Sequence, residues 1–116
     1  MKIKHVRKSA EFAEILKKGE KIRKGWITAF FRICPEISRL SAGVIVSKKT
    51  EPLATGRNYL RRIIYAVCGE KADRFKRKTE IVVRLDGPVK NKSRKEIYGG
   101  LRNDLTEVLE RISEKT

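Results

Sequence analysis

The chain has 116 residues, which suits one domain and is too short for two ordinary ones, so we expect a single domain over residues 1–116. A hydrophobic content of 40% supports a modest core and excludes an intrinsically disordered chain. Twenty-nine Lys and Arg against fourteen Asp and Glu give a net charge of +15, which predicts a polyanionic partner, nucleic acid before an anionic membrane surface.

The N-terminal part of the chain is predicted to form a basic tail and a short helix. The tail covers residues 1–8 and leads into Ser9, whose side chain suits a helix N-cap. The helix carries Phe12 on its apolar face and ends at Gly19, a residue type that favours helix termination.

Three strands are predicted next. Residues 21–23 leave room for a short strand. Residues 26–33 form a longer one with apolar side chains at both alternating sets of positions, so we expect it inside the sheet. Trp26 and Phe30 share one face of that strand. Residues 42–47 have the β-branched composition of a third, buried strand.

A helix, a strand and a long helix complete the chain. The middle helix covers about residues 53–68 with Gly69 as its end, and a strand follows over residues 80–85. Residues 93–113 have apolar side chains at spacings of three and four, the pattern of an amphipathic helix. The α-β-β-β-α-β-α order predicts an α/β (α+β) two-layer sandwich, in which three helices pack on a central mixed sheet of about four strands.

The basic residues are unevenly distributed over these elements. Residues 48–78 hold ten basic residues against three acidic ones, and residues 1–24 hold nine against three. Residues 93–116 hold five of each sign. Because charge that served only solubility would have less reason to spare one helix, we expect the binding surface on the middle helix and its flanks.

The middle helix has one polar and one apolar side. At about 100° per residue, one sector of this helix collects Arg57, Asn58, Arg61, Arg62 and Tyr65. Arginine grips phosphate oxygens with a planar fork and stacks on bases, while an amide or a phenol can pair with or stack on RNA. A solvated basic face is the plainer interpretation, but residues 53–68 contain no acidic residue to balance the arginines.

These segments resemble a known family. The stretch SAGVIVSKK (Ser41–Lys49), followed by ATGRNYLRRIIYAV (Ala54–Val67), resembles the signature of the bacterial ribonuclease P protein. That signature is a strand, a paired lysine and a helix of the form R-N-x-x-[KR]-R-x-x-R. EFAEILKKG (Glu11–Gly19) is similar to the family's first helix, and the later strand and closing helix fall where the family has them.

The resemblance implies a protein subunit of ribonuclease P, which binds the catalytic RNA and the 5′ leader of precursor tRNA and assists removal of the leader. The chain would then be the accessory subunit of an endoribonuclease, with RNA and RNA-bound magnesium as the catalytic centre. No catalytic residue, metal site or cofactor would belong to the protein alone. Its partners would be the RNA subunit and precursor tRNA. The resemblance also implies a left-handed β-α-β crossover, opposite to the general rule.

The resemblance assigns two groups of site residues. The RNA-binding group consists of Lys48, Lys49, Arg57, Asn58, Arg61, Arg62 and Tyr65. A cleft for the leader, between the first helix and the sheet, would be lined by Phe12, Trp26 and Phe30, because single strands bind by stacking beside a basic track. Aromatic residues at helix or strand spacing are also typical of a core, which is the plainer interpretation of these three.

The residues themselves give no support for catalysis or metal binding by the protein. The lone histidine, His5, lies in the tail, and no serine or cysteine has the setting of a nucleophile. Cys34 and Cys68 are isolated, which predicts packed thiols in a reducing cytosol rather than a disulfide or a zinc site.

The chain has no apolar run of about 18 residues and no signal-peptide pattern, so we expect a cytoplasmic protein that does not bind membranes. The alternative function is a noncatalytic RNA-binding or ribosome-associated protein of similar fold, because fold likeness alone does not separate the two.

Overall fold

The computed structural model describes residues 4–5, 9–35, 40–86 and 93–116, with side chains from Phe12 onward. Most of the predicted basic tail therefore lies outside the described residues. The helices and strands in chain order are β1 (Lys4–His5), α1 (Ser9–Lys18), β2 (Glu20–Lys24), β3 (Ile27–Ile33), β4 (Leu40–Ile45), α2 (Ala54–Lys71), a 3-10 turn η1 (Ala72–Arg74), β5 (Thr79–Leu85) and α3 (Arg94–Glu114).

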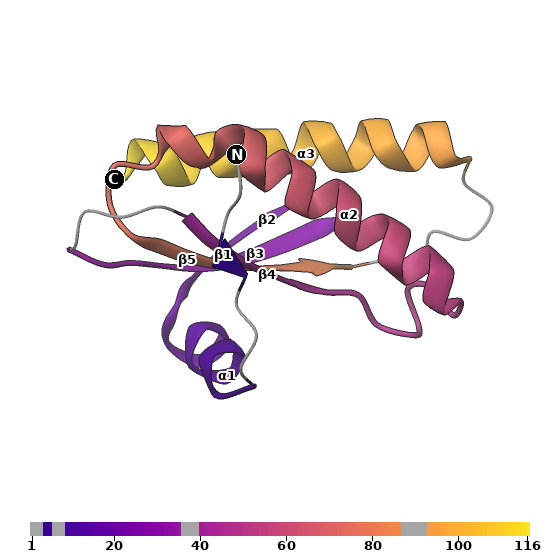
Figure 1. Cartoon of the computed structure of the whole chain (residues 1–116), viewed down its shortest axis with the longest axis horizontal. Helices are drawn as coiled ribbons and strands as arrows, with labels where there is room; N and C mark the ends of the chain where they lie inside the picture. The colour runs from indigo at the N-terminus through magenta and orange to yellow at the C-terminus, as the bar shows by residue number, and fades with distance from the viewer. Residues whose placement is uncertain (1–3, 6–8, 36–39, 87–92) are drawn as a thin grey trace.

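The strands form one mixed sheet in the order β1-β4-β5-β3-β2. β4 lies parallel to β1 and β5, while β3 lies antiparallel to β5 and β2. Helices α2 and α3 cover one face of the sheet and α1 lies on the other face (Figure 1). The predicted α+β architecture with three helices on a mixed sheet is confirmed. The structure adds the two-residue strand β1 and places α1 opposite the other two helices.

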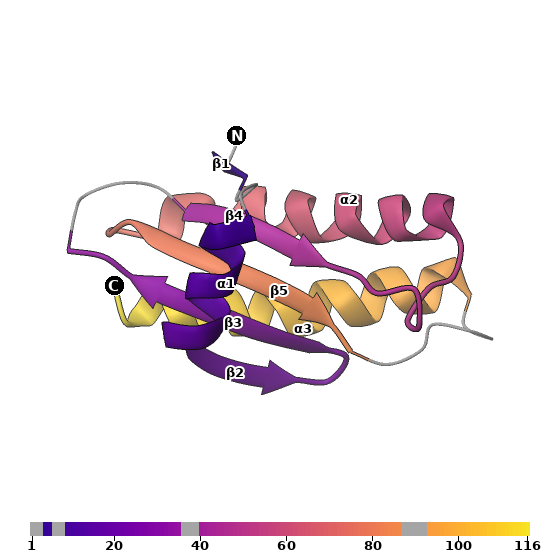
Figure 2. The same ribbon diagram turned by 90° about the horizontal axis from the view of Figure 1, so that it is seen from below.

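The connection through α2 has the less common hand. In Figure 2, α2 and α3 lie behind the sheet, β4 and β5 run in the same direction, and α2 joins the end of β4 to the start of β5. This arrangement is a left-handed β-α-β crossover, whereas such connections are right-handed in nearly all folds. Because of it, α2 lies over the β4 side of the sheet, with α3 beside it.

Alternation along the strands divides the apolar residues between two cores. Ile27, Ala29 and Phe31 of β3 face α2 and α3 in the main core, while Phe30 joins Ile15 of α1 in a smaller cluster on the opposite face. Half-buried Phe12, Leu16 and Ile45 pack against the smaller cluster. The two sheet faces therefore offer different environments, and α1 covers only part of its face.

The predicted end of α2 is wrong, and α3 begins with a regular N-cap. Gly69 does not end α2, which runs to Lys71, and the backbone N–H of Ala72 bonds to the Gly69 carbonyl. Glycine permits a helix end but does not require one. At α3, the Ser93 hydroxyl accepts a hydrogen bond from the Glu96 N–H, which satisfies one of the open donors of the first turn.

Both cysteines are free thiols, as predicted. Cys68 is fully buried on α2, and its burial raises the pKa of the thiol to about 12, so it stays neutral and unreactive. Among the described helices, none is long and apolar enough to cross a membrane.

Candidate nucleic-acid interface

Helix α2 packs one side on the sheet and exposes the other. Its buried residues are Leu60, Ile63, Ile64, Val67 and Cys68. On the opposite side Asn58 and Arg62 are exposed, and the Nη1 group of Arg61 donates to Oδ1 of Asn58 over 3.3 Å. Tyr65 is half-buried and packs against the main core at the margin of this side. The predicted polar sector is therefore present, with Tyr65 at its edge.

The turn before α2 presents two lysines. Thr50 is buried and its hydroxyl donates to the Leu85 carbonyl over 3.3 Å, while the Thr50 N–H bonds to the Ser47 hydroxyl over 3.2 Å. These bonds fix the turn to the end of β5. Lys48 and Lys49, between the two anchored residues, are exposed.

The Arg57 side chain is hydrogen-bonded to the loop that follows this turn. Its Nη1 group donates to the backbone carbonyls of Glu51, over 3.0 Å, and Pro52, over 2.9 Å. Because these bonds cross from the second turn of α2 to the preceding loop, Arg57 fixes the position of the lysine turn relative to the helix. We refer to Lys48, Lys49, Arg57, Asn58, Arg61, Arg62 and Tyr65 together as the α2 surface.

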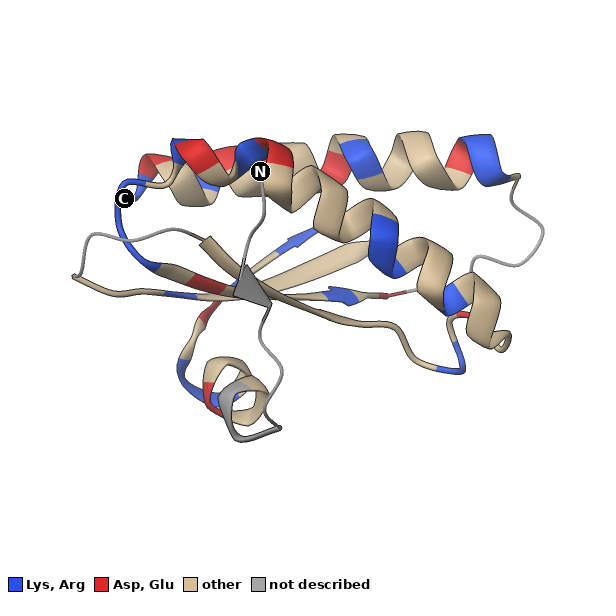
Figure 3. Ribbon diagram, in the orientation of Figure 1, with Lys and Arg blue, Asp and Glu red and all other residues tan. Residues whose placement is uncertain are grey.

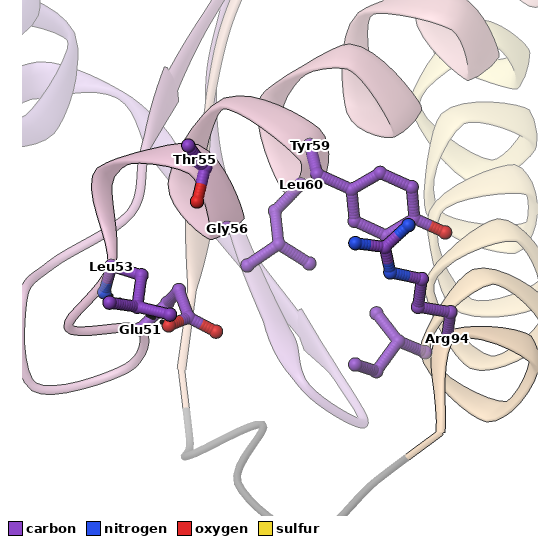
Figure 4. Close-up of a pocket in the computed structure, with 8 residues that line it drawn as sticks. Glu51, Leu53, Thr55, Gly56, Tyr59, Leu60 and Arg94 are labelled. Atoms are coloured by element: carbon purple, nitrogen blue, oxygen red, sulfur yellow. Dashed lines mark hydrogen bonds between the residues drawn. The ribbon is translucent and has the colours of Figure 1, made fainter.

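A pocket of about 240 Å³ lies beside the α2 surface, between the first turns of α2 and α3. Figure 4 shows the Arg94 side chain against the ring of Tyr59, and its guanidinium carbon lies 5.2 Å from the ring centroid. The Glu51 carboxylate accepts from the Leu53 N–H over 3.0 Å and lies against Gly56, where a Cβ would come within 2.6 Å of it. Gly56 thus permits the close approach of the Glu51 side chain to α2.

The charge pattern separates the two helices on this face. Figure 3 shows Lys and Arg along α2, whereas α3 carries Asp and Glu as well as Lys and Arg. Several α3 charges are paired: Glu107 with Lys24 (3.1 Å) and Arg111 (3.0 Å), and Glu110 with Lys71 (3.5 Å). The α2 surface therefore carries positive charge that neighbouring acids do not balance, the pattern that attracts a phosphate backbone.

The aromatic residues predicted for a leader cleft divide between the two faces of the sheet. Phe12 and Phe30 meet under α1, as expected. Trp26 precedes β3 in the turn after Gly25, and its ring packs against Gly100 of α3, on the other face. Gly25 has a φ of +55°, so the strand alternation expected from Trp26 onward begins only at Ile27. The structure therefore does not bring Trp26 together with Phe12 and Phe30.

Sequence reasoning missed a second basic site next to Phe30. Arg84 of β5 places its guanidinium carbon 5.2 Å from the Phe30 ring centroid. The Arg84 Nε donates to the Asp86 carboxylate over 2.8 Å, and the Thr28 hydroxyl donates to the other carboxylate oxygen. Alternation along β5 places Arg84 on the same face as Val82, but only the register with β3 shows that it meets Phe30.

The carboxylate of this second site is ionised. Burial by itself raises the pKa of Asp86, but the hydrogen bonds from Thr28 and Arg84 and the nearby positive charges outweigh burial and hold the pKa below its usual value. Elsewhere in the described part of the chain, no group of three or more His, Cys, Asp or Glu residues is placed to hold a metal ion.

Comparison with known proteins gives a consistent result. The family model for Ribonuclease P matches residues 1–113 of the chain. The structure of the RNase P protein of Staphylococcus aureus superposes with a TM-score of 0.76 at 25% identity, covering 92% of this chain and 96% of that one. The RNase P protein of Thermotoga maritima has the same fold, with a TM-score of 0.73, 21% identity and coverage of 93% and 96%. No curated protein sequence matches the chain.

Proposed function

Because this chain belongs to the ribonuclease P protein family, and is thus the protein subunit of an endoribonuclease whose catalyst is RNA, we propose that its α2 surface docks on that RNA. Its further partner in this role is precursor tRNA, whose 5′ leader the enzyme removes. The family match covers nearly the whole chain, which favours this function over that of an unrelated RNA-binding or ribosome-associated protein of similar fold.

One observation carries the proposal for docking. Asn58, Arg61 and Arg62 lie on the side of α2 that faces away from the core, and the anchored turn before α2 exposes Lys48 and Lys49. A packed helix and an anchored turn hold the backbone of these residues, so little loop entropy is lost when they meet phosphates. Arginine forks suit phosphate oxygens, and the Asn58 amide suits a base edge or a 2′-hydroxyl.

The leader is assigned to the face of the sheet that carries α1. Phe12 is half-buried at the edge of the small core, where part of its ring remains available to an extended strand of RNA. Trp26 lies on the opposite face and is not assigned to this path. Lys49 and Arg84 continue the path along the ends of β4 and β5. A basic track beside an aromatic residue is the common way to hold single-stranded RNA.

Catalysis is assigned to the RNA subunit and to magnesium ions held by it. In this proposal the protein contributes positioning and charge. The cytoplasm, where precursor tRNA is matured, is the proposed place of action.

The first test is cleavage of a precursor tRNA by a bacterial ribonuclease P RNA at low magnesium, with and without the full chain. We expect strong stimulation and a cut at the mature 5′ end. Tight, salt-sensitive RNA binding without stimulation would instead support the noncatalytic alternative.

The α2 surface is tested by changing Arg61 and Arg62 together to Ala. We expect the pair to abolish docking on the RNA subunit at physiological salt, measured by titration of labelled RNA, with the circular dichroism spectrum unchanged. The matched control is Arg74→Ala/Arg77→Ala, which removes two exposed arginines before β5 and leaves docking intact. Loss of the dichroism signal in the Arg61/Arg62 variant would show a structural role instead.

A further inference from the structure

The pocket between the first turns of α2 and α3 differs in composition from the basic surface beside it. Its volume of about 240 Å³ lies below the roughly 300–1,000 Å³ of pockets for drug-sized ligands, so it suits one small ring system. Buried Leu60 and Ile97 give it an apolar lining. Figure 4 shows Glu51 and Arg94 on opposite sides of Leu60. The pocket therefore has a hydrogen-bond acceptor on one side and a donor on the other.

The Glu51 side chain is held in place by its surroundings. The Glu51 N–H donates to the Ser47 carbonyl over 3.1 Å, and the Glu51 carbonyl accepts from Arg57 over 3.0 Å. Its Oε1 atom accepts from the Leu53 N–H over 3.0 Å, and the chain packs closely on Gly56. The Leu53 N–H occupies only one acceptor position of the carboxylate. The remaining positions are oriented in advance for a ligand in the pocket.

A fixed carboxylate is unexpected beside a surface that binds phosphates, because it repels them. Within the described part of the chain, no lysine or arginine forms an ion pair with Glu51, and no acid forms one with Arg94. The edges of RNA bases, unlike phosphates, carry N–H donors that a carboxylate can accept. The chemistry of Glu51 therefore indicates contact with a base edge.

Guanine matches both charged residues of the pocket. Its N1–H and N2–H groups lie side by side and suit the two oxygens of the Glu51 carboxylate. Its O6 and N7 atoms accept hydrogen bonds from an arginine, here Arg94. Adenine, cytosine and uracil each present a single donor group to a carboxylate. The charge arrangement therefore favours guanine over the other bases.

Apolar surface at the rim of the pocket is open to be covered by a ring. Leu53 lines the pocket and is 67% exposed. On the other side, the Arg94 guanidinium carbon lies 5.2 Å from the Tyr59 ring centroid, and both groups are of the kind on which unstacked bases pack. Tyr59 also lies three residues before Arg62, and side chains at that spacing are neighbours on a helix. RNA docked on the α2 surface therefore passes the pocket.

We propose that this pocket binds one unstacked guanine of the ribonuclease P RNA. Its N1–H and N2–H groups donate to the Glu51 carboxylate, and its O6 atom accepts from Arg94. Gly56 and Arg57 are positioning residues that hold Glu51. The inference rests on the proposed function, in which the α2 surface docks on the RNA subunit, and it adds recognition of one base to the contacts with phosphates.

Glu51→Gln separates recognition of the base from charge. Glutamine keeps an acceptor for the Leu53 N–H. Loss of a negative charge from a basic surface would by itself tighten RNA binding, whereas loss of the paired hydrogen bonds should weaken binding of the RNA subunit about tenfold. The affinity is measured by titrating labelled RNA with full-length protein. Glu114→Gln, the control, removes an exposed carboxylate at the far end of α3 and should not weaken binding. Unchanged or tighter binding by Glu51→Gln would overturn the proposal.

Gly56→Ala displaces the Glu51 carboxylate without changing any charge. A Cβ at this position would lie 2.6 Å from the carboxylate carbon, which belongs to a flexible side chain and can move, while alanine favours the helix. We expect a similar loss of affinity, an unchanged circular dichroism spectrum, and no further loss in the double variant with Glu51→Gln. Gly99→Ala, in open space on α3, is the control. Additive losses would contradict the role of Gly56 in holding Glu51.

The base is identified with an RNA subunit in which inosine replaces a small fraction of the guanosines, because inosine lacks the N2 amino group. Protein-bound and free RNA are separated, and the positions of inosine in each are compared. We expect a position at which inosine weakens binding to the wild-type protein but not to Glu51→Gln. Absence of such a position would overturn the guanine pocket and leave docking through α2 intact. Failure of unmodified RNA to bind the wild-type protein would instead refute the proposed function.

Discussion

Arg57 shows how a residue that fits a binding motif can act within the protein. The sequence places it on the polar sector of α2 with Arg61 and Arg62, and that placement is confirmed. Its hydrogen bonds to the carbonyls of Glu51 and Pro52 could not be predicted, because they depend on the path of a turn without periodic pattern. The side chain is half-buried, unlike exposed Arg62.

Arg57→Ala is expected to weaken docking on the RNA subunit about tenfold, by releasing the turn that holds Lys48 and Lys49, and to lower the free energy of unfolding by roughly 1 kcal/mol. A double-mutant cycle with Lys49→Ala checks the cause, with affinity measured by RNA titration. We expect Lys49→Ala to add little once Arg57 is gone, while Arg62→Ala and Lys49→Ala add fully. Additive losses for Arg57 and Lys49 would show that Arg57 acts on RNA independently of the turn.

At the scale of elements, periodicity predicted most of the fold. The apolar spacing in α3 predicted the helix face that joins the main core, and the apolar side chains at both sets of positions in β3 predicted that this strand lies inside the sheet. The errors fall where periodicity ends: α2 continues past Gly69, and Trp26 belongs to a turn with a positive φ at Gly25. The meeting of Arg84 with Phe30 depends on the register between strands about fifty residues apart, which local pattern does not contain.

Substitution by alanine should change the stability of the protein in opposite directions at two glycines, Gly19 at the junction of α1 with β3 and Gly99 on α3. A Cβ on Gly19 would lie 2.5 Å from the Ile15 carbonyl oxygen and 2.8 Å from that of Phe31, both backbone atoms. Gly19→Ala should therefore push α1 from the sheet and destabilise the protein by roughly 1–3 kcal/mol. Gly99→Ala, in open space on α3, should stabilise it by about 0.5–1 kcal/mol. Urea unfolding measures both, and a destabilised Gly99 variant would contradict the helix assignment there.

For the whole molecule, the net charge of +15 opposes compaction through repulsion between like charges. The distribution of this charge over the surface therefore matters. Ion pairs absorb much of the charge around α3, including Lys24 and Arg111 on Glu107 and Arg102 on Glu70. The α2 surface and the ends of β4 and β5 keep exposed cations, among them Lys48, Lys49, Arg62 and Arg84. Binding should then depend on a few local cations and not on the total charge.

Salt dependence separates local contacts from total charge. With roughly six phosphates contacted, affinity for the RNA subunit should fall about a thousandfold between about 50 and 200 mM salt. Each lost phosphate contact lowers the slope of log affinity against log salt by about 0.7–0.9. If Arg61 and Arg62 each contact one phosphate, the double variant Arg61→Ala/Arg62→Ala should lower the slope by roughly 1.4–1.8. Slopes are best compared at low salt, where the weakened variant still binds measurably.

The control Lys24→Ala/Arg111→Ala removes an equal number of positive charges, from two cations that are paired with Glu107, so it should leave the slope unchanged. Equal reductions in both variants would mean that net charge, and not the α2 surface, governs binding.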